Sequence, residues 1–155
     1  QKRAIAALVS DDAQLARTLR ADGVHIGPSD DPLAAYEEAR DILGTRFIVG
    51  VDSTASRHDA MSLGEGGAEY IAFGLIGDDV SAAALRRDLV SWWSEIFEVP
   101  CVALSGNSDP AIAADLAAAG ADFVAVWLPP DLTPDDAARW LDSHAVAVTA
   151  PATVG

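Results

Sequence analysis

Residues 8–31, LVSDDAQLARTLRADGVHIGPSDD, decide the fold class. A short apolar run ends in acid, a helical segment follows, and a second apolar run again ends in acid. This order predicts two parallel β-strands joined by a helix, with Asp11 just past the first strand and Asp30 just past the second. Because parallel strands end at one edge of a sheet, both carboxylates are expected on one rim, where α/β proteins place their sites. The pair is therefore a candidate magnesium site.

The same alternation continues along the chain and predicts six βα units. Such a series implies a parallel sheet with right-handed crossovers, either open and doubly wound or part of an eight-stranded barrel. Six units are too few to close the usual barrel, and a missing N-terminal βαβα segment would explain that. The predicted strands are 5–10, 23–26, 47–52, 70–74, 101–105 and 123–127, and the predicted helices are 12–20, 32–43, 56–64, 82–97, 110–119 and 134–143.

Composition limits the function classes. The chain has 155 residues, half of them apolar, and a formal charge of −14. This favours one sizeable domain and argues against nucleic acid, whose phosphates require clustered Lys and Arg. Cys101, the only cysteine, lies in an apolar run and is expected to be buried. Neither a signal peptide nor a membrane-length apolar run is evident, so we expect a cytoplasmic protein without membrane contact.

Local signals support several of these elements. One short pattern, Ala followed by an acid and an apolar strand, occurs three times, with acids at Asp22, Glu69 and Asp122. These acids precede their strands, away from the rim, so we expect them to bind backbone amides. Leu85, Leu89, Trp92, Trp93 and Ile96 are spaced as one buried helix face. Helix starts with an N-cap residue before proline are expected at Asp31-Pro32, Asp109-Pro110 and Thr133-Pro134.

Taken in order, LVSDD, ADGVHIG, IVGVD, GGAEYIAFG, PCVALSG and AAGADFVAV resemble thiamine-phosphate synthase and its relative the thiazole tautomerase. The resemblance implies a TIM (β/α)8 barrel, with residues 1–155 forming a single domain that supplies about strands three to eight. It also implies a transferase of thiamine biosynthesis that couples hydroxymethylpyrimidine pyrophosphate with thiazole phosphate and loses pyrophosphate. A small phosphorylated thiamine precursor is then the expected partner, and a homo-oligomer is compatible with it.

Carried over by position, the resemblance assigns Asp11 and Asp30 to Mg²⁺. It assigns the substrate or its phosphates to Ser10, Asp52, Ser53, Ser105, Gly106 and Asn107. Asp52 stands where the family has a phosphate-binding serine, and residues 75–80 replace a loop that carries Thr-x-Thr-Lys. A pyrophosphate would be repelled by the first change and would lose a cation through the second. The resemblance thus predicts a diverged paralogue with a degenerate pyrophosphate site.

Several alternatives stay open at this stage. Asp11 and Asp30 could serve as helix N-caps instead of metal ligands, although Asp12 and Asp31 are also available as caps. His25 is expected to be a hydrogen-bonded histidine inside the barrel in preference to a proton carrier. The chain could also belong to an active enzyme whose missing cations lie upstream, or to a non-catalytic barrel that binds a small phosphate or serves assembly.

Overall fold

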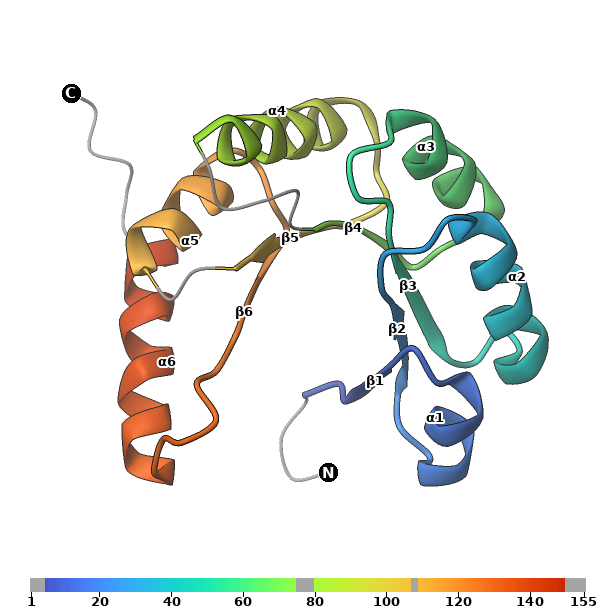
Figure 1. Ribbon diagram of the computed structural model, residues 1–155, viewed down its shortest axis with the longest axis horizontal. Coiled ribbons are helices and arrows are strands. Elements are labelled where there is room, and N and C mark those ends of the chain that lie inside the picture. The colour runs from blue at the N-terminus through green and yellow to red at the C-terminus, as the bar shows by residue number, and fades with distance from the viewer. Residues whose placement is uncertain (1–4, 75–79, 107–108, 150–155) are drawn as a thin grey trace. The chain divides into compact units, whose positions relative to one another are not determined.

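The computed structural model describes residues 5–74, 80–106 and 109–149, in which strands and helices alternate along the chain (Figure 1). Two compact units are present, Gln1–Ala72 and Phe73–Gly155. The strands are β1 (Leu8–Ser10), β2 (Gly23–Ile26), β3 (Ile48–Asp52), β4 (Tyr70–Phe73), β5 (Cys101–Ser105) and β6 (Phe123–Val126). The helices are α1 (Ala13–Leu19), α2 (Pro32–Leu43), α3 (Arg57–Gly66), α4 (Val80–Ile96), α5 (Pro110–Ala118) and α6 (Pro134–Thr149).

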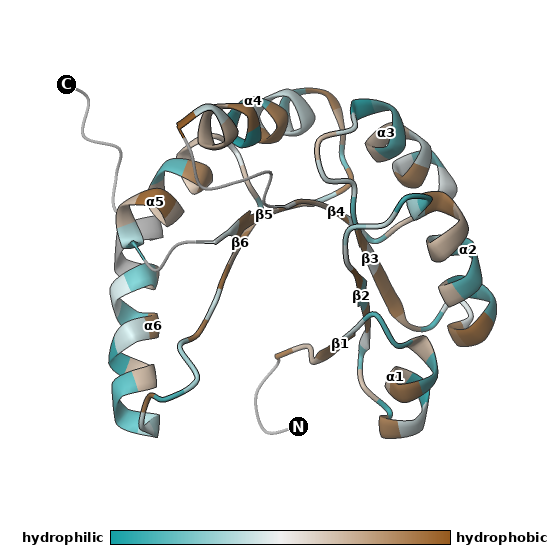
Figure 2. Ribbon diagram, in the orientation of Figure 1, coloured by the Kyte–Doolittle hydropathy of each residue, from teal (hydrophilic) through white to brown (hydrophobic). Residues whose placement is uncertain are grey.

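The first unit is built on parallel strands in the order β1-β2-β3-β4. Its core consists of β-branched residues that the strands bury almost completely, namely Val24, Val49, Val51 and Ile71. Such continuous apolar strands are typical of parallel sheets. Figure 2 shows that the strands are mostly apolar, whereas the helices carry both apolar and hydrophilic residues. The predicted βα order of this unit is therefore confirmed.

The helix caps of the first unit settle one alternative for the rim aspartates. Asp12 caps α1, where its Oδ1 accepts from the Leu15 amide at 2.8 Å. Asp31 caps α2 in the same way, through a bond of 3.0 Å from the Ala34 amide, with proline at the first helical position. The N-cap interpretation of Asp11 and Asp30 is wrong, because each lies one residue before the cap.

The three repeated acids bind backbone amides, as expected. Asp22 Oδ2 accepts from the Ala7 amide at 2.7 Å, and Glu69 Oε2 accepts from the Val49 amide at 2.8 Å. Asp122 Oδ2 accepts from the Cys101 amide at 2.8 Å. In each pair the backbone returns a bond, from the amide of the acid to the carbonyl of its partner. The repeat is thus a structural clamp at the amino ends of neighbouring strands.

The second unit contains parallel strands β5 and β6 with helices α4, α5 and α6. Helix α4 buries Trp93, whose indole N–H donates to the Val99 carbonyl at 2.7 Å and whose ring stacks on Phe97. The predicted buried face was wrong in part, because Leu85 and Ile96 are 40% and 62% exposed. The inward stripe instead follows Ala82, Arg86, Leu89, Val90 and Trp93, at three- and four-residue spacing.

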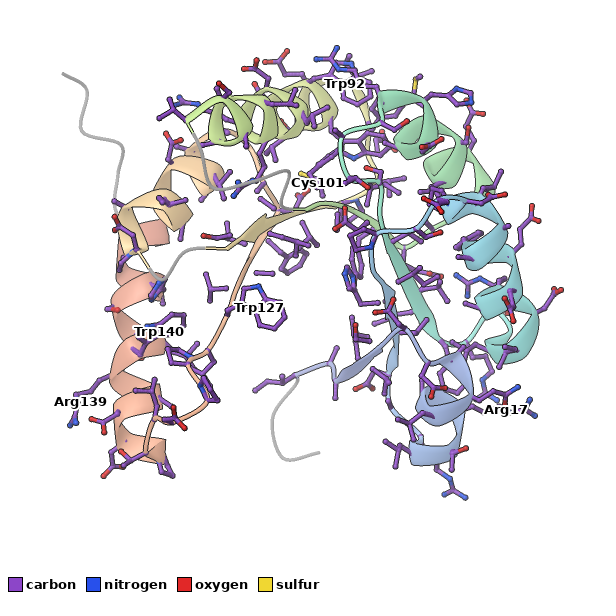
Figure 3. The ribbon with its side chains drawn as sticks, in the orientation of Figure 1. Arg17, Trp92, Cys101, Trp127, Arg139 and Trp140 are labelled. Atoms are coloured by element: carbon purple, nitrogen blue, oxygen red, sulfur yellow. The ribbon has the colours of Figure 1, made fainter. Side chains whose placement is uncertain are left out.

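Element boundaries agree with the sequence-based expectations within a few residues, except at two places. Strand β1 begins at Leu8 instead of residue 5, and α6 continues to Thr149 instead of ending at residue 143. At the start of α6, Thr133 and Asp136 form a capping pair, and Asp136 also accepts from Arg139. Figure 3 shows the Arg139 side chain extending from this helix. In the described part of the chain, no helix is long and apolar enough to cross a membrane.

Candidate functional site at the strand ends

Asp11 is held in an unusual backbone conformation directly after β1. Its φ is +56°, in the left-handed region that non-glycine residues seldom adopt, and its amide donates to the His25 carbonyl at 2.9 Å. The carboxylate is gripped on both oxygens. Oδ1 accepts from the Gly27 amide at 2.6 Å, and Oδ2 accepts from the Ser10 hydroxyl at 2.9 Å. A solvent-exposed carboxylate is therefore oriented in advance at the rim.

The second predicted metal ligand, Asp30, lies exposed in the loop between β2 and α2. Within residues 5–74, 80–106 and 109–149, no group of three or more His, Cys, Asp or Glu side chains could hold a metal ion. Magnesium, however, commonly binds through one or two carboxylates together with substrate phosphates. The oriented Asp11 carboxylate fits that mode, since each oxygen keeps further lone pairs beside its one hydrogen bond.

A cleft of about 330 Å³ opens beside Asp11. Its polar part comes from Asp11, Asp12, Gln14 and Glu38 and from the loop after β2, which includes Ser29. Apolar residues of β2, α1 and α2 complete the lining. A group bound to the Asp11 carboxylate therefore has room next to the β2–α2 loop.

Asp52 and Ser53, at the end of β3, are both buried, with 1% and 2% of their surface exposed. Asp52 Oδ1 accepts from the Thr54 amide at 2.7 Å, and Thr54 adopts a left-handed φ of +58°. The Ser53 amide and hydroxyl both donate to the Ala72 carbonyl, at 2.9 and 3.3 Å. The carboxylate thus stabilises a tight turn, and the serine hydroxyl is occupied by the backbone of β4.

His25 and Tyr70 meet across the sheet, and Ser10 is the register partner of His25 on β1. The His25 Nδ1 and Tyr70 Oη atoms are 2.9 Å apart, and the two rings are nearly parallel, with an interplanar angle of 6°. Burial lowers the pKa of His25, and the nearby Asp52 and Asp11, which act to raise it, offset this only in part. Burial, aided by Asp52, raises the pKa of Tyr70 to about 12. The imidazole is therefore neutral and the phenol protonated at neutral pH.

The remaining predicted site residues belong to the second unit. Ser105 is buried at the end of β5, and Gly106 follows it on the surface. Asn107 lies outside the described residues, as does the loop 75–79, so the structure leaves their predicted roles open. A cationic side chain lies near this strand end. Arg86 of α4, only 5% exposed, donates from Nη1 to the Leu104 carbonyl at 3.1 Å.

Sequence reasoning missed Gly50 and Tyr70. Gly50 lies inside β3, where an isolated glycine weakens a strand and often marks the close approach of another group. The group is Tyr70, since a Cβ on Gly50 would lie 1.9 Å from Tyr70 Cζ. An interior strand glycine was the available signal. Its partner could be found only from the strand register, which pairs Gly50 with both His25 and Tyr70.

Solved structures share the fold at low sequence identity. A 3-hexulose-6-phosphate synthase matches 91% of this chain and 73% of its own with a TM-score of 0.56 and 20% identity. The Amycolatopsis orientalis BexX/CysO complex matches 86% of this chain and 58% of its own with a TM-score of 0.59 and 18% identity. These likenesses confirm the expected α/β fold of the TIM-barrel type.

Sequence comparisons are more specific. A family model described as thiamine monophosphate synthase matches residues 1–128. The thiamine-phosphate synthase of Erythrobacter litoralis is 44% identical over 127 residues, which cover 79% of this chain and 58% of the relative. The Rhodospirillum centenum and Hyphomonas neptunium enzymes of that name are 43% and 40% identical and are covered to 60% and 57%. The chain thus spans somewhat over half the length of these curated relatives, and it belongs to the thiamine-phosphate synthase family.

Proposed function

We propose that this protein binds magnesium and the phosphorylated precursors of thiamine phosphate at the rim of its first unit, and that its pyrophosphate site is weakened. The reaction after which the family is named would join hydroxymethylpyrimidine pyrophosphate to thiazole phosphate with loss of pyrophosphate. Such a loss requires that negative charge on the leaving group be neutralised as it develops. The proposal extends the relatives' activity to this chain, which matches only part of their length.

The observation that carries the proposal is the geometry of Asp11. A left-handed, non-glycine residue costs about 1–3 kcal/mol of backbone strain, and such strain tends to be kept at functional sites. Here the strain aims a carboxylate from the end of β1, and the Gly27 amide and Ser10 hydroxyl fix its orientation. A residue that served only as a cap would not need this conformation, because Asp12 already caps α1.

In this proposal Asp11 and Asp30 hold the magnesium ion from adjacent strand ends. When bound, the ion would supply charge neutralisation for a pyrophosphate group. The Gly27 amide and Ser10 hydroxyl keep the Asp11 carboxylate in one orientation, so that little reorganisation accompanies binding. The neighbouring cleft leaves room beside the Asp11 carboxylate for the ion and phosphate groups.

The pyrophosphate site is weakened because Asp52 brings a buried negative charge to the end of β3. Its carboxylate is held by the Thr54 amide, and the Ser53 hydroxyl beside it is already bonded to the Ala72 carbonyl. Neither group is then suited to receive a phosphate. This feature favours weak turnover, and it also supports a second candidate function, a family barrel that binds a small phosphate without catalysis.

The deciding experiment is a thiamine-phosphate assay with both precursors and magnesium, on the complete protein. We expect slow, magnesium-dependent product formation, which Asp11→Asn abolishes. Asp31→Asn is the matched control, since it makes the same charge change at a helix cap that does not line the cleft, and asparagine caps helices as well as aspartate. Equal activity of wild type and Asp11→Asn would contradict the assignment of Asp11.

The second candidate is separated by calorimetry. If no thiamine phosphate forms, titration with thiazole phosphate distinguishes a binding barrel from a protein that takes neither precursor. Heat that depends on magnesium and is lost in Asp11→Asn would support the non-catalytic binding function. Absence of both product and heat would refute both candidates.

A further inference from the structure

Three residues form a row across the sheet of the first unit. The register pairs His25 of β2 with Gly50 of β3, and Gly50 with Tyr70 of β4. Because Gly50 has no side chain, the Tyr70 ring lies across β3, where three of its carbons fall within 2.3 Å of the position that a Cβ on Gly50 would take. The phenol oxygen thereby reaches His25 Nδ1 at 2.9 Å. The glycine is the gap through which the two rings meet.

The direction of this hydrogen bond follows from the chemistry of its two groups. A phenol O–H is a better donor than the N–H of a neutral imidazole, and an imidazole nitrogen is a better acceptor than a phenol oxygen. Burial raises the pKa of Tyr70, so the phenol keeps its proton and is the donor to Nδ1 across 2.9 Å. With Nδ1 accepting, the ring proton resides on Nε2.

We propose that Tyr70 is a positioning residue whose hydroxyl, passing over Gly50, locks His25 in the Nε2–H tautomer, so that His25 offers a neutral N–H donor to an uncharged acceptor atom of a ligand. The His25 ring is half-buried and leaves part of its surface accessible. His25 lies on the face of β2 opposite Val24 and Ile26, which line the cleft on the helix side. The donor thus serves a different space from the carboxylate cleft.

The ligand class follows from the charge around the ring. Asp52 and Asp11 both act electrostatically on His25, and both are acids. A phosphate at Nε2 would be repelled by these carboxylates, whereas a ring nitrogen or a hydroxyl oxygen would not. Of the precursors in the proposed function, on which this part of the inference rests, the uncharged pyrimidine ring has the required chemistry.

The tautomer is measured by long-range ¹H–¹⁵N NMR of the histidine rings in the free protein, without any substrate. We expect His25 to show a protonated Nε2 and an unprotonated, accepting Nδ1. His144 provides an internal reference for the opposite tautomer, because its Nδ1 lies 2.9 Å from the Trp140 carbonyl and must donate. A His25 pattern like that of His144 would overturn the proposal.

Two variants separate the lock from a general structural role. Tyr70→Phe keeps the ring but removes the donor, and we expect His25 to become a mixture of tautomers while His144 is unchanged. Gly50→Ala keeps both residues but displaces the phenol, and it should give the same mixture if Tyr70→Phe folds poorly. An unaltered His25 tautomer in a folded variant would refute the lock.

The donor role is tested with hydroxymethylpyrimidine, which carries no phosphate, and with inorganic phosphate as the control probe. We expect the pyrimidine to shift the His25 Nε2 resonance in wild type and to shift it less in Tyr70→Phe, and phosphate to leave it unchanged. A shift of the Nε2 resonance with phosphate alone, or no shift with either probe, would refute the donor role. Because the tautomer is read without substrate, a protein that lacks synthase activity but shows the lock would refute only the proposed function.

Discussion

Replacing Gly50 by alanine is the sharpest test of how the first unit is packed. The added Cβ would lie 1.9, 2.1 and 2.3 Å from three carbons of the Tyr70 ring. Carbon atoms cannot approach so closely, so the ring must leave its place over β3. Since Tyr70 Oη is then withdrawn from His25 Nδ1, the hydrogen bond of 2.9 Å is broken as well.

The expected loss of stability has two parts. Forcing an extra methyl group into a well-packed site costs about 1–3 kcal/mol. Losing the hydrogen bond between two half-buried groups costs about 1 kcal/mol more. We therefore expect Gly50→Ala to lower the free energy of unfolding by about 2–4 kcal/mol, a large share of the stability of a typical domain.

The assay is urea unfolding of four proteins: wild type, Gly50→Ala, Tyr70→Ala and the double variant. If the clash is with the Tyr70 ring, Gly50→Ala should cost less than about 0.5 kcal/mol once that ring has been removed. Gly66→Ala is the matched control, because a Cβ there would make only ordinary contacts at 3.7 and 3.8 Å. An equal cost of Gly50→Ala with and without the Tyr70 ring would refute this reasoning.

Three further predictions concern the second unit. Asp122→Ala should lower the free energy of unfolding by about 1–3 kcal/mol, measured by urea unfolding, because it leaves the buried Cys101 amide without its carboxylate partner. The Cys101 thiol is fully buried and burial raises its pKa, so a thiol reagent should react with it only in denaturant; rapid reaction in the native protein would contradict this packing. Hydrogen bonds from Thr133 and then Arg139 lower the pKa of Asp136. These bonds to the ionised carboxylate therefore stabilise the fold above the usual carboxyl pKa, and the stabilisation is lost as pH falls through the lowered pKa. In an NMR titration, Thr133→Val should move the Asp136 pKa back up.

Local chemistry is what could be predicted well from the sequence. Asp31 and Asp109 precede prolines and do cap their helices, because capping depends on neighbouring residues alone. The acids of the repeated pattern also bind backbone amides as expected. The sequence motifs assigned the chain to the correct family, since the family model of thiamine monophosphate synthase matches residues 1–128.

Predictions failed where they depended on the surroundings of a helix or turn. Leu85 and Ile96 have the spacing of a buried face, yet both are exposed, because the sheet contacts a neighbouring stripe of α4 that includes the charged Arg86. Asp11 and Asp30 were each one residue away from the capping position. The metal and phosphate assignments stay predictions, to be tested by the Asp11→Asn and Asp31→Asn pair.

The order of strands and helices, the caps and the rim position of Asp11 follow from the linear chain, since they depend on hydrophobic period and on residues a few positions apart. The row formed by His25, Gly50 and Tyr70 does not, because its members are 25 and 20 positions apart and meet only through the register of three strands. The left-handed backbone that aims the Asp11 carboxylate likewise depends on its bond to the His25 carbonyl. Sequence therefore determined which side chains are present at the rim, and tertiary structure decided which of them are held in one orientation.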